Sequence, residues 1–165
     1  MELIQHTINW AKGEILEATI MGTIGFLILA SALMFWKFGS TPYAKAMVIP
    51  LLVVGIIPLL AGISGVISNR NRIPDYEQAW QQDPQKFMLA EKERVEGFDE
   101  IFKYTYPGAI IFVISGAVLF FVLSSPTGKA ISLALMVLGL MAYFIDHFAA
   151  ERAQIYLEQI EKALP

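Results

Sequence analysis

The chain has 165 residues, of which 56% are hydrophobic and only 16% are charged, with a formal net charge of −3. A soluble domain usually carries about 25% charged residues, so this composition predicts an integral membrane protein, and the length is that of a single domain. The absence of cysteine excludes disulfides and thiolate-bound metals. The Walker A, GxSxG, HExxH and dinucleotide-binding glycine motifs are also missing from the sequence.

The residues before the first long apolar segment form an amphipathic lead. Apolar residues are interspersed among polar ones there, which predicts an amphipathic helix lying on the membrane surface. The lead has neither the positive start nor the small-residue cleavage site of a signal peptide. Its apolar positions are Leu3, Ile4, Trp10, Ile15 and Leu16.

Four apolar segments follow along the chain. A helix of about 17–25 residues crosses a bilayer, and the first three segments reach that length without a charged residue. The fourth reaches it only by including Asp146 and His147. We therefore predict an all-α integral membrane protein, a four-transmembrane-helix bundle in one domain of residues 1–165. The predicted spans are residues 18–36, 46–68, 107–123 and 130–150.

Polar sequence separates the second and third spans. Residues 69–82 predict a linker with a short helix, and Asp83 followed by proline predicts the start of a longer one. We expect cytoplasmic helical structure over about residues 75–105. After the fourth span, Ala153, Tyr156 and Ile160 recur at helical spacing, so that helix is predicted to continue past the membrane and to pack on another.

The distribution of charge predicts the orientation. All fifteen acidic residues, and nine of the twelve Lys and Arg, lie before, between or after the two pairs of spans. The two short connections hold only Lys37, Lys45 and Lys129. Because positive charge collects on the cytoplasmic side, we predict a multi-pass protein of the inner (plasma) membrane with both termini in the cytoplasm. That side is net negative, which argues against a nucleic-acid partner.

Residues 14–76 resemble residues 100–156. At an offset of 86, Glu14 and Gly22 match Glu100 and Gly108, and after two slips Tyr76 matches Tyr156. Two-span units that repeat in this way are related by an axis along the membrane normal. We therefore predict two parallel-repeated helical hairpins with cytoplasmic helical extensions.

The polar residues that close the fourth span allow several interpretations. His147 and Glu151 are four residues apart and share a helix face, so they are candidate metal ligands, with Glu14, Glu17 or Glu100 to complete the set. A haem between His6 and His147 is a further alternative. The preferred interpretation is that Asp146 and His147 mark the exit of a helix into water, where an ionisable group costs little. The preferred prediction therefore includes no cofactor, no metal and no catalytic residue.

Basic residues leave the second and fourth spans close to the acidic end of the first. If the repeats pack symmetrically, they form an ion-paired ring that gates an ion, binds a lipid headgroup or simply anchors the bundle. The ring comprises Arg70, Arg72, Arg152 and Asp146, with Glu14 and Glu17 as acidic partners.

The functional expectation is a protein that binds rather than catalyses. The leading hypothesis is an accessory or interaction protein of the inner membrane that contacts a partner through its acidic cytoplasmic helices, and an immunity-type protein belongs to this group. The partners are then the lipid bilayer and either another protein or further copies of the chain. Two alternatives stay open, namely a small oligomeric channel or transporter and a membrane enzyme with a metal or lipid site near His147.

Overall fold

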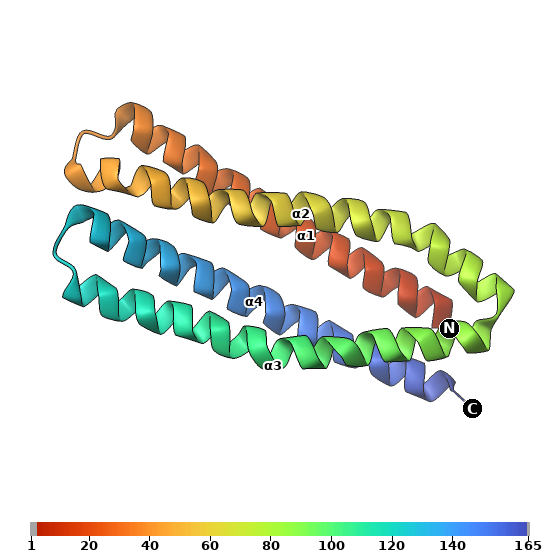
Figure 1. Cartoon of the computed structure of the whole chain (residues 1–165). Helices are drawn as coiled ribbons and strands as arrows, with labels where there is room; N and C mark the ends of the chain where they lie inside the picture. Colours follow the sequence, from red (N-terminus) through yellow and green to blue (C-terminus); the bar gives the residue numbers. More distant parts are fainter. Residues whose placement is uncertain (1–2, 165) are drawn as a thin grey trace.

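Four long helices make up the computed structural model, which describes residues 3–164 apart from the side chain of Asp99. Helices α1 and α2 form one hairpin, α3 and α4 form a second, and the two lie side by side (Figure 1). Each helix is long and apolar enough to cross a membrane by length and composition. The helices are α1 (Leu3–Phe38), α2 (Pro42–Gln82), α3 (Pro84–Val122) and α4 (Pro126–Ala163).

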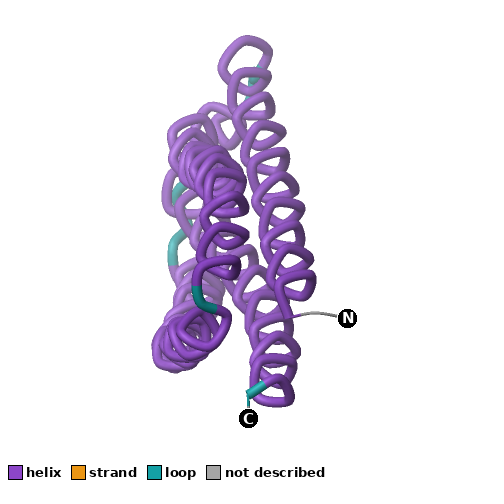
Figure 2. Tube along the Cα trace, turned by 90° about the vertical axis from the view of Figure 1, so that its right-hand side faces the viewer, coloured by secondary structure: helices purple, strands orange, loops and turns teal. Residues whose placement is uncertain are grey.

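The connections between the helices are short (Figure 2), and each ends in the same kind of N-terminal helix cap. Thr41, Asp83 and Ser125 each cap the helix that follows by accepting a hydrogen bond from the backbone N–H three residues on, at 3.0–3.1 Å. A proline comes directly after each of them, and proline fits the first helical turn because no intrahelical donor is needed there. The predicted helix start at Asp83 is confirmed.

Two of the local predictions are wrong. Residues 3–17 do not lie on a surface as a separate helix, because α1 runs unbroken from Leu3 to Phe38 and buries Leu3, Thr7 and Trp10 against the rest of the molecule. Residues 69–82 are not a linker, because α2 continues to Gln82 and includes Pro74. Packing of Ile73 and Tyr76 in the core holds this stretch helical despite the proline.

The large buried side chains gather at one end of the bundle. We call this the polar end, and it comprises residues 3–17, 69–106 and 146–164. Its core includes Trp10, Tyr76, Phe87, Val95, Tyr156 and Ile160. Along the apolar remainder most buried residues are Ala and Gly, and bulky side chains such as Phe26 and Phe121 point outward, 61% and 83% exposed. Outward apolar side chains suit a lipid environment, because lipid is as apolar as a protein core.

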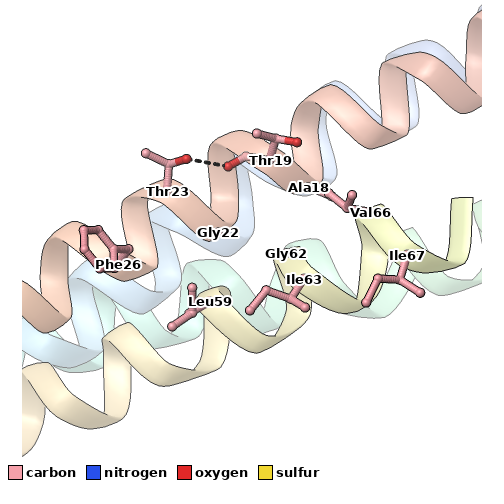
Figure 3. Close-up of a pocket in the computed structure, with 10 residues that line it drawn as sticks. All are labelled: Ala18, Thr19, Gly22, Thr23, Phe26, Leu59, Gly62, Ile63, Val66 and Ile67. Atoms are coloured by element: carbon pink, nitrogen blue, oxygen red, sulfur yellow. Dashed lines mark hydrogen bonds between the residues drawn. The ribbon is translucent and has the colours of Figure 1, made fainter. Parts of the chain in front are cut away.

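Glycines allow the two helices of each hairpin to approach closely. A Cβ on Gly62 of α2 would lie 2.5 Å from the carbonyl oxygen of Ala18 and 2.6 Å from the Cα of Gly22 on α1. Figure 3 shows this crossing, with Phe26 on α1 and Leu59 on α2. In the second hairpin a Cβ on Gly139 of α4 would lie 2.7 Å from the carbonyl oxygen of Ala109. Such small-residue contacts are how membrane helices associate.

Candidate functional site

All four helices meet at the polar end around one buried carboxylate. Glu91 of α3 is only 5% exposed. It lies with Arg94 of the same helix, Tyr156 of α4 and Thr7 of α1, and we call these four residues the Glu91 network. Tyr76 of α2 completes the surroundings.

Hydrogen bonds connect the members of the Glu91 network. Arg94 donates twice to Glu91, from Nε to Oε1 at 2.9 Å and from Nη2 to Oε2 at 2.6 Å. The Tyr156 hydroxyl donates to Oε2 of Glu91 at 2.9 Å. The Thr7 hydroxyl lies 2.7 Å from the Tyr156 oxygen and 3.2 Å from the carbonyl oxygen of Leu3. Because Tyr156 gives its own proton to Glu91, the one Thr7 proton is shared between these two acceptors. One chain of hydrogen bonds therefore joins α1, α4 and α3.

Aromatic rings enclose the Arg94 guanidinium. Its central carbon lies 4.5 Å from the ring centre of Trp10, 5.5 Å from Phe98 and 5.7 Å from Tyr76. Trp10 also stacks on Tyr156, with ring centres 5.6 Å apart and an 18° angle between the planes. A guanidinium held over aromatic faces gains cation–π attraction, which is strongest where water is excluded.

Tyr76, Tyr156 and Arg94 each keep one protonation state at neutral pH. Burial, reinforced by the Glu91 charge, raises the pKa of Tyr156 far above its ordinary value. Burial also raises the pKa of Tyr76. Burial alone would lower the pKa of Arg94, but its hydrogen bonds to Glu91 outweigh this effect and the pKa is raised. Both tyrosines are therefore neutral and Arg94 is charged at neutral pH.

A second polar cluster joins α1 to α4 where the apolar stretch begins. Nη2 of Arg152 lies 2.8 Å from Oε1 of Glu14 and also contacts Oε2 of Glu17. The Arg152 side chain packs beside Gly13, where a Cβ would lie 3.1 Å from the Arg152 Cδ. We call Glu14, Glu17 and Arg152 the Arg152 cluster.

The structure brings together only part of the predicted ring. Arg152 meets both predicted acidic partners, while Arg70 and Arg72 are exposed at the surface of α2. Asp146 is half-buried. Within residues 3–164, none of Arg70, Arg72 and Asp146 forms an ion pair.

The predicted metal ligands are dispersed. His147 is exposed and stacks on Tyr143, with ring centres 6.3 Å apart, and Glu151 is exposed as well. Glu100 pairs with Lys103 at 2.8 Å on the surface of α3. In the described part of the chain, no three His, Asp or Glu side chains lie together in a way that could hold a metal ion.

The haem alternative has no matching space beside His6. The cavity there has a volume of about 150 Å³ and does not include His147 in its lining. Small-molecule pockets usually begin at about 300 Å³.

Sequence reasoning missed the Glu91 network. The available signal was a carboxylate on the apolar stripe of α3, one turn after Phe87, one turn before Val95 and two turns before Phe98. Its hydrogen-bond partner Tyr156 is 65 residues away, and no local spacing relates the two.

No protein-family model, no curated protein and no solved structure matches this chain. The class therefore follows from the fold. Four candidate spans in an all-helical chain are those of a multi-pass membrane protein in contact with the lipid bilayer.

Proposed function

We propose that this chain is a non-catalytic membrane protein whose polar end projects into the cytoplasm and binds a protein partner with a basic surface. The observation that carries the proposal is the excess of negative charge at the polar end, which holds fourteen acidic residues and nine basic ones. Four exposed carboxylates there, on α2, α3 and α4, form no ion pair within the described residues. They are Asp75, Glu77, Glu93 and Glu151.

The rigidity of the polar end supports a docking role. Helix α2 has 41 residues, about 61 Å at 1.5 Å per residue, whereas the hydrocarbon core of a bilayer is about 30 Å thick. The excess length is packed against the other helices by the aromatic core and the Glu91 network. A packed extension holds its surface charges in fixed positions, so little entropy is lost when a partner binds.

Orientation and repetition belong to the same proposal. Nine of the twelve Lys and Arg lie at or beside the polar end, which favours a cytoplasmic position with both termini inside. Two parallel-repeated hairpins account for the similar burial of Tyr76 and Tyr156, 8% and 3% exposed, at matching positions of the two units. They also account for the contact of Gly55 and Gly139 with the preceding helix of each hairpin.

The apolar linings between the hairpins make the interaction role preferable to a channel. The space between α1 and α4 and the space between α2 and α4 are lined almost entirely by apolar side chains. An ion leaving water would find few ligands there to replace its hydration shell. The dispersed positions of His147, Glu151 and Glu100 likewise favour binding over catalysis.

Site-specific photocrosslinking in cells tests the proposal. A crosslinker at Glu93 should give a protein adduct that disappears when Asp75, Glu77 and Glu151 are changed to Asn or Gln. The control crosslinker replaces Phe121, which is 83% exposed on the apolar part of α3, and should give no such adduct. The absence of a protein adduct at Glu93, or an adduct unaffected by the neutral variant, would contradict an acidic docking surface.

A further inference from the structure

A groove about 580 Å³ in volume runs between α1 and α4, from the Arg152 cluster into the apolar part of the bundle. Its walls are two stripes of bulky apolar residues spaced one turn apart, as expected for one face of each helix. Leu16, Ile20 and Ile24 come from α1, and Leu140, Phe144 and Phe148 come from α4. All six side chains are 40–62% exposed, so the described chain leaves about half of each side chain uncovered.

The length of the groove matches one leaflet of a bilayer. The eight-residue rise from Leu16 to Ile24 corresponds to about 12 Å of helix. Half of the hydrocarbon core is about 15 Å thick. A groove of this length that starts at the charged boundary and ends inside the apolar region has the dimensions of one lipid acyl chain.

The Arg152 cluster sets the charge at the open end. Glu17 and Arg152 both line the groove, and Glu14 shares the same guanidinium. Two carboxylates against one guanidinium leave one negative charge in excess. Within the described residues, Oε1 of Glu17 accepts no hydrogen bond, while Oε2 contacts Arg152. The excess negative charge favours a cation at the open end of the groove.

This charge pattern selects among lipid headgroups. A primary ammonium supplies positive charge and three N–H donors, as in lysine. A quaternary ammonium has the charge without the donors. All of these lipids carry a phosphate anion, and phosphatidylglycerol has no ammonium to offset it, so its headgroup would place a net negative charge beside two carboxylates.

We propose that the groove between α1 and α4 binds one acyl chain of a phosphatidylethanolamine, with the lipid ammonium on Glu17. This lipid site lies in the apolar part of the bundle. It is separate from the acidic docking surface. The inference depends on the chain being embedded in a membrane and does not depend on the protein partner.

Lipid competition on the purified full chain tests the site. Non-denaturing mass spectrometry would count bound phosphatidylethanolamine, phosphatidylcholine and phosphatidylglycerol of identical acyl chains, each added to delipidated protein in detergent. We expect one tight site for phosphatidylethanolamine, with an affinity about tenfold above those of the other two lipids, or about 1.4 kcal/mol. Equal binding of the three lipids, or a preference for phosphatidylglycerol or phosphatidylcholine, would overturn the proposal.

Matched variants separate the groove from general lipid contact. Ile20→Trp fills the groove and should remove the tight site, whereas Leu27→Trp, at a position 58% exposed on the same helix but outside the groove, should keep it. Glu17→Gln should keep acyl-chain binding and lose the preference for the primary ammonium. If Ile20→Trp fails to fold, Leu140→Phe fills the groove from α4 with a smaller change. Wild-type binding in a folded groove-filling variant would refute the assignment.

Discussion

A buried carboxylate is stabilising only when its charge and its hydrogen-bond acceptors are matched. At Glu91 the matching is nearly complete, because Arg94 neutralises the charge with two hydrogen bonds and Tyr156 donates a third. The third bond matters for the whole molecule, because it joins α4 to α3. Through its contact with Thr7, Tyr156 also joins α4 to α1.

Replacing Tyr156 by Phe should therefore destabilise the fold while leaving the ring stack on Trp10 in place. A hydrogen bond to a charged group contributes about 1.5–3 kcal/mol, and we expect the free energy of unfolding to fall by about that amount. A denaturant titration in mild detergent measures the loss. Tyr104→Phe is the matched control, because Tyr104 is 78% exposed and its change should stay within about 0.5 kcal/mol.

The raised pKa values of Tyr76 and Tyr156 predict a loss of stability in alkali. Unfolded tyrosines ionise near pH 10, while the folded protein keeps both protons, so the unfolded state binds fewer protons above that pH. Stability should be unaffected by these groups below pH 10. Above it, stability should fall by up to about 1.4 kcal/mol per pH unit for each tyrosine. Thermal unfolding between pH 8 and 11.5 tests this, and a Tyr156→Phe protein with an unchanged slope would contradict the assignment.

His147 provides a test of the metal alternative. Its exposed position beside Tyr143 predicts that His147→Gln leaves metal content unchanged and shifts stability by no more than about 0.5 kcal/mol. Elemental analysis of the purified protein and its variant measures the first quantity. Stoichiometric metal in the wild type that is lost in the variant would establish a site at this position.

At the scale of the helical elements, two glycines separate the effect of helix packing on stability from the effect of helix propensity. Gly62 lies against the backbone of α1, and an added Cβ has no space there. Gly97 lies on α3 with no atom within 4 Å of such a Cβ. Both are within helices, where alanine is intrinsically better than glycine by about 1 kcal/mol.

We therefore expect Gly62→Ala and Gly97→Ala to change stability in opposite directions. Gly62→Ala forces α1 and α2 apart and should cost about 1–3 kcal/mol. Gly97→Ala should stabilise the protein by up to about 1 kcal/mol. Unfolding measurements in the same detergent decide the matter. Stabilisation by both substitutions would show that the hairpin does not depend on the close contact at Gly62.

At the scale of the whole molecule, the proposed orientation predicts a reporter pattern. Reporters inserted at Asp83 and fused after Leu164 should both be active in the cytoplasm, because the polar end carries most of the positive charge. A reporter at Ser124, in the connection between α3 and α4, should be active on the opposite side. The reverse pattern would overturn the orientation and leave the four candidate spans intact.

The proposed repeat is broken at specific positions of the structure. Glu14 pairs with Arg152, but its counterpart Glu100 pairs with the nearby Lys103. Gly22 lies close to Gly62, but at its counterpart Gly108 a Cβ would meet nothing within 4 Å. Each hairpin therefore has different contacts, and within the described residues Glu100 and Arg72 do not form a counterpart of the Arg152 cluster.

The sequence by itself determined the class and the elements of this protein. Four apolar stretches without internal charge predict four helices, because unpaired backbone groups are not tolerated in lipid, and Asp83 before a proline predicts a helix start. These signals are local. The sequence did not reveal that residues 3–17 and 69–82 continue the spans as unbroken helices, because propensity is weak for a stretch whose helicity depends on distant packing.

Only the tertiary structure decided which polar residues meet. Of the three arginines predicted for the ring, Arg152 is the one that pairs with Glu14 among the described residues, and Tyr156 reaches Glu91 across 65 residues of sequence. His147 and Glu151, at metal-ligand spacing, face outward. The physical reason is that spacing along one helix defines a face, whereas the side chains opposite that face are set by how four helices cross. The glycines that allow those crossings contact the backbone of the neighbouring helix. No periodic pattern in the sequence predicts these contacts.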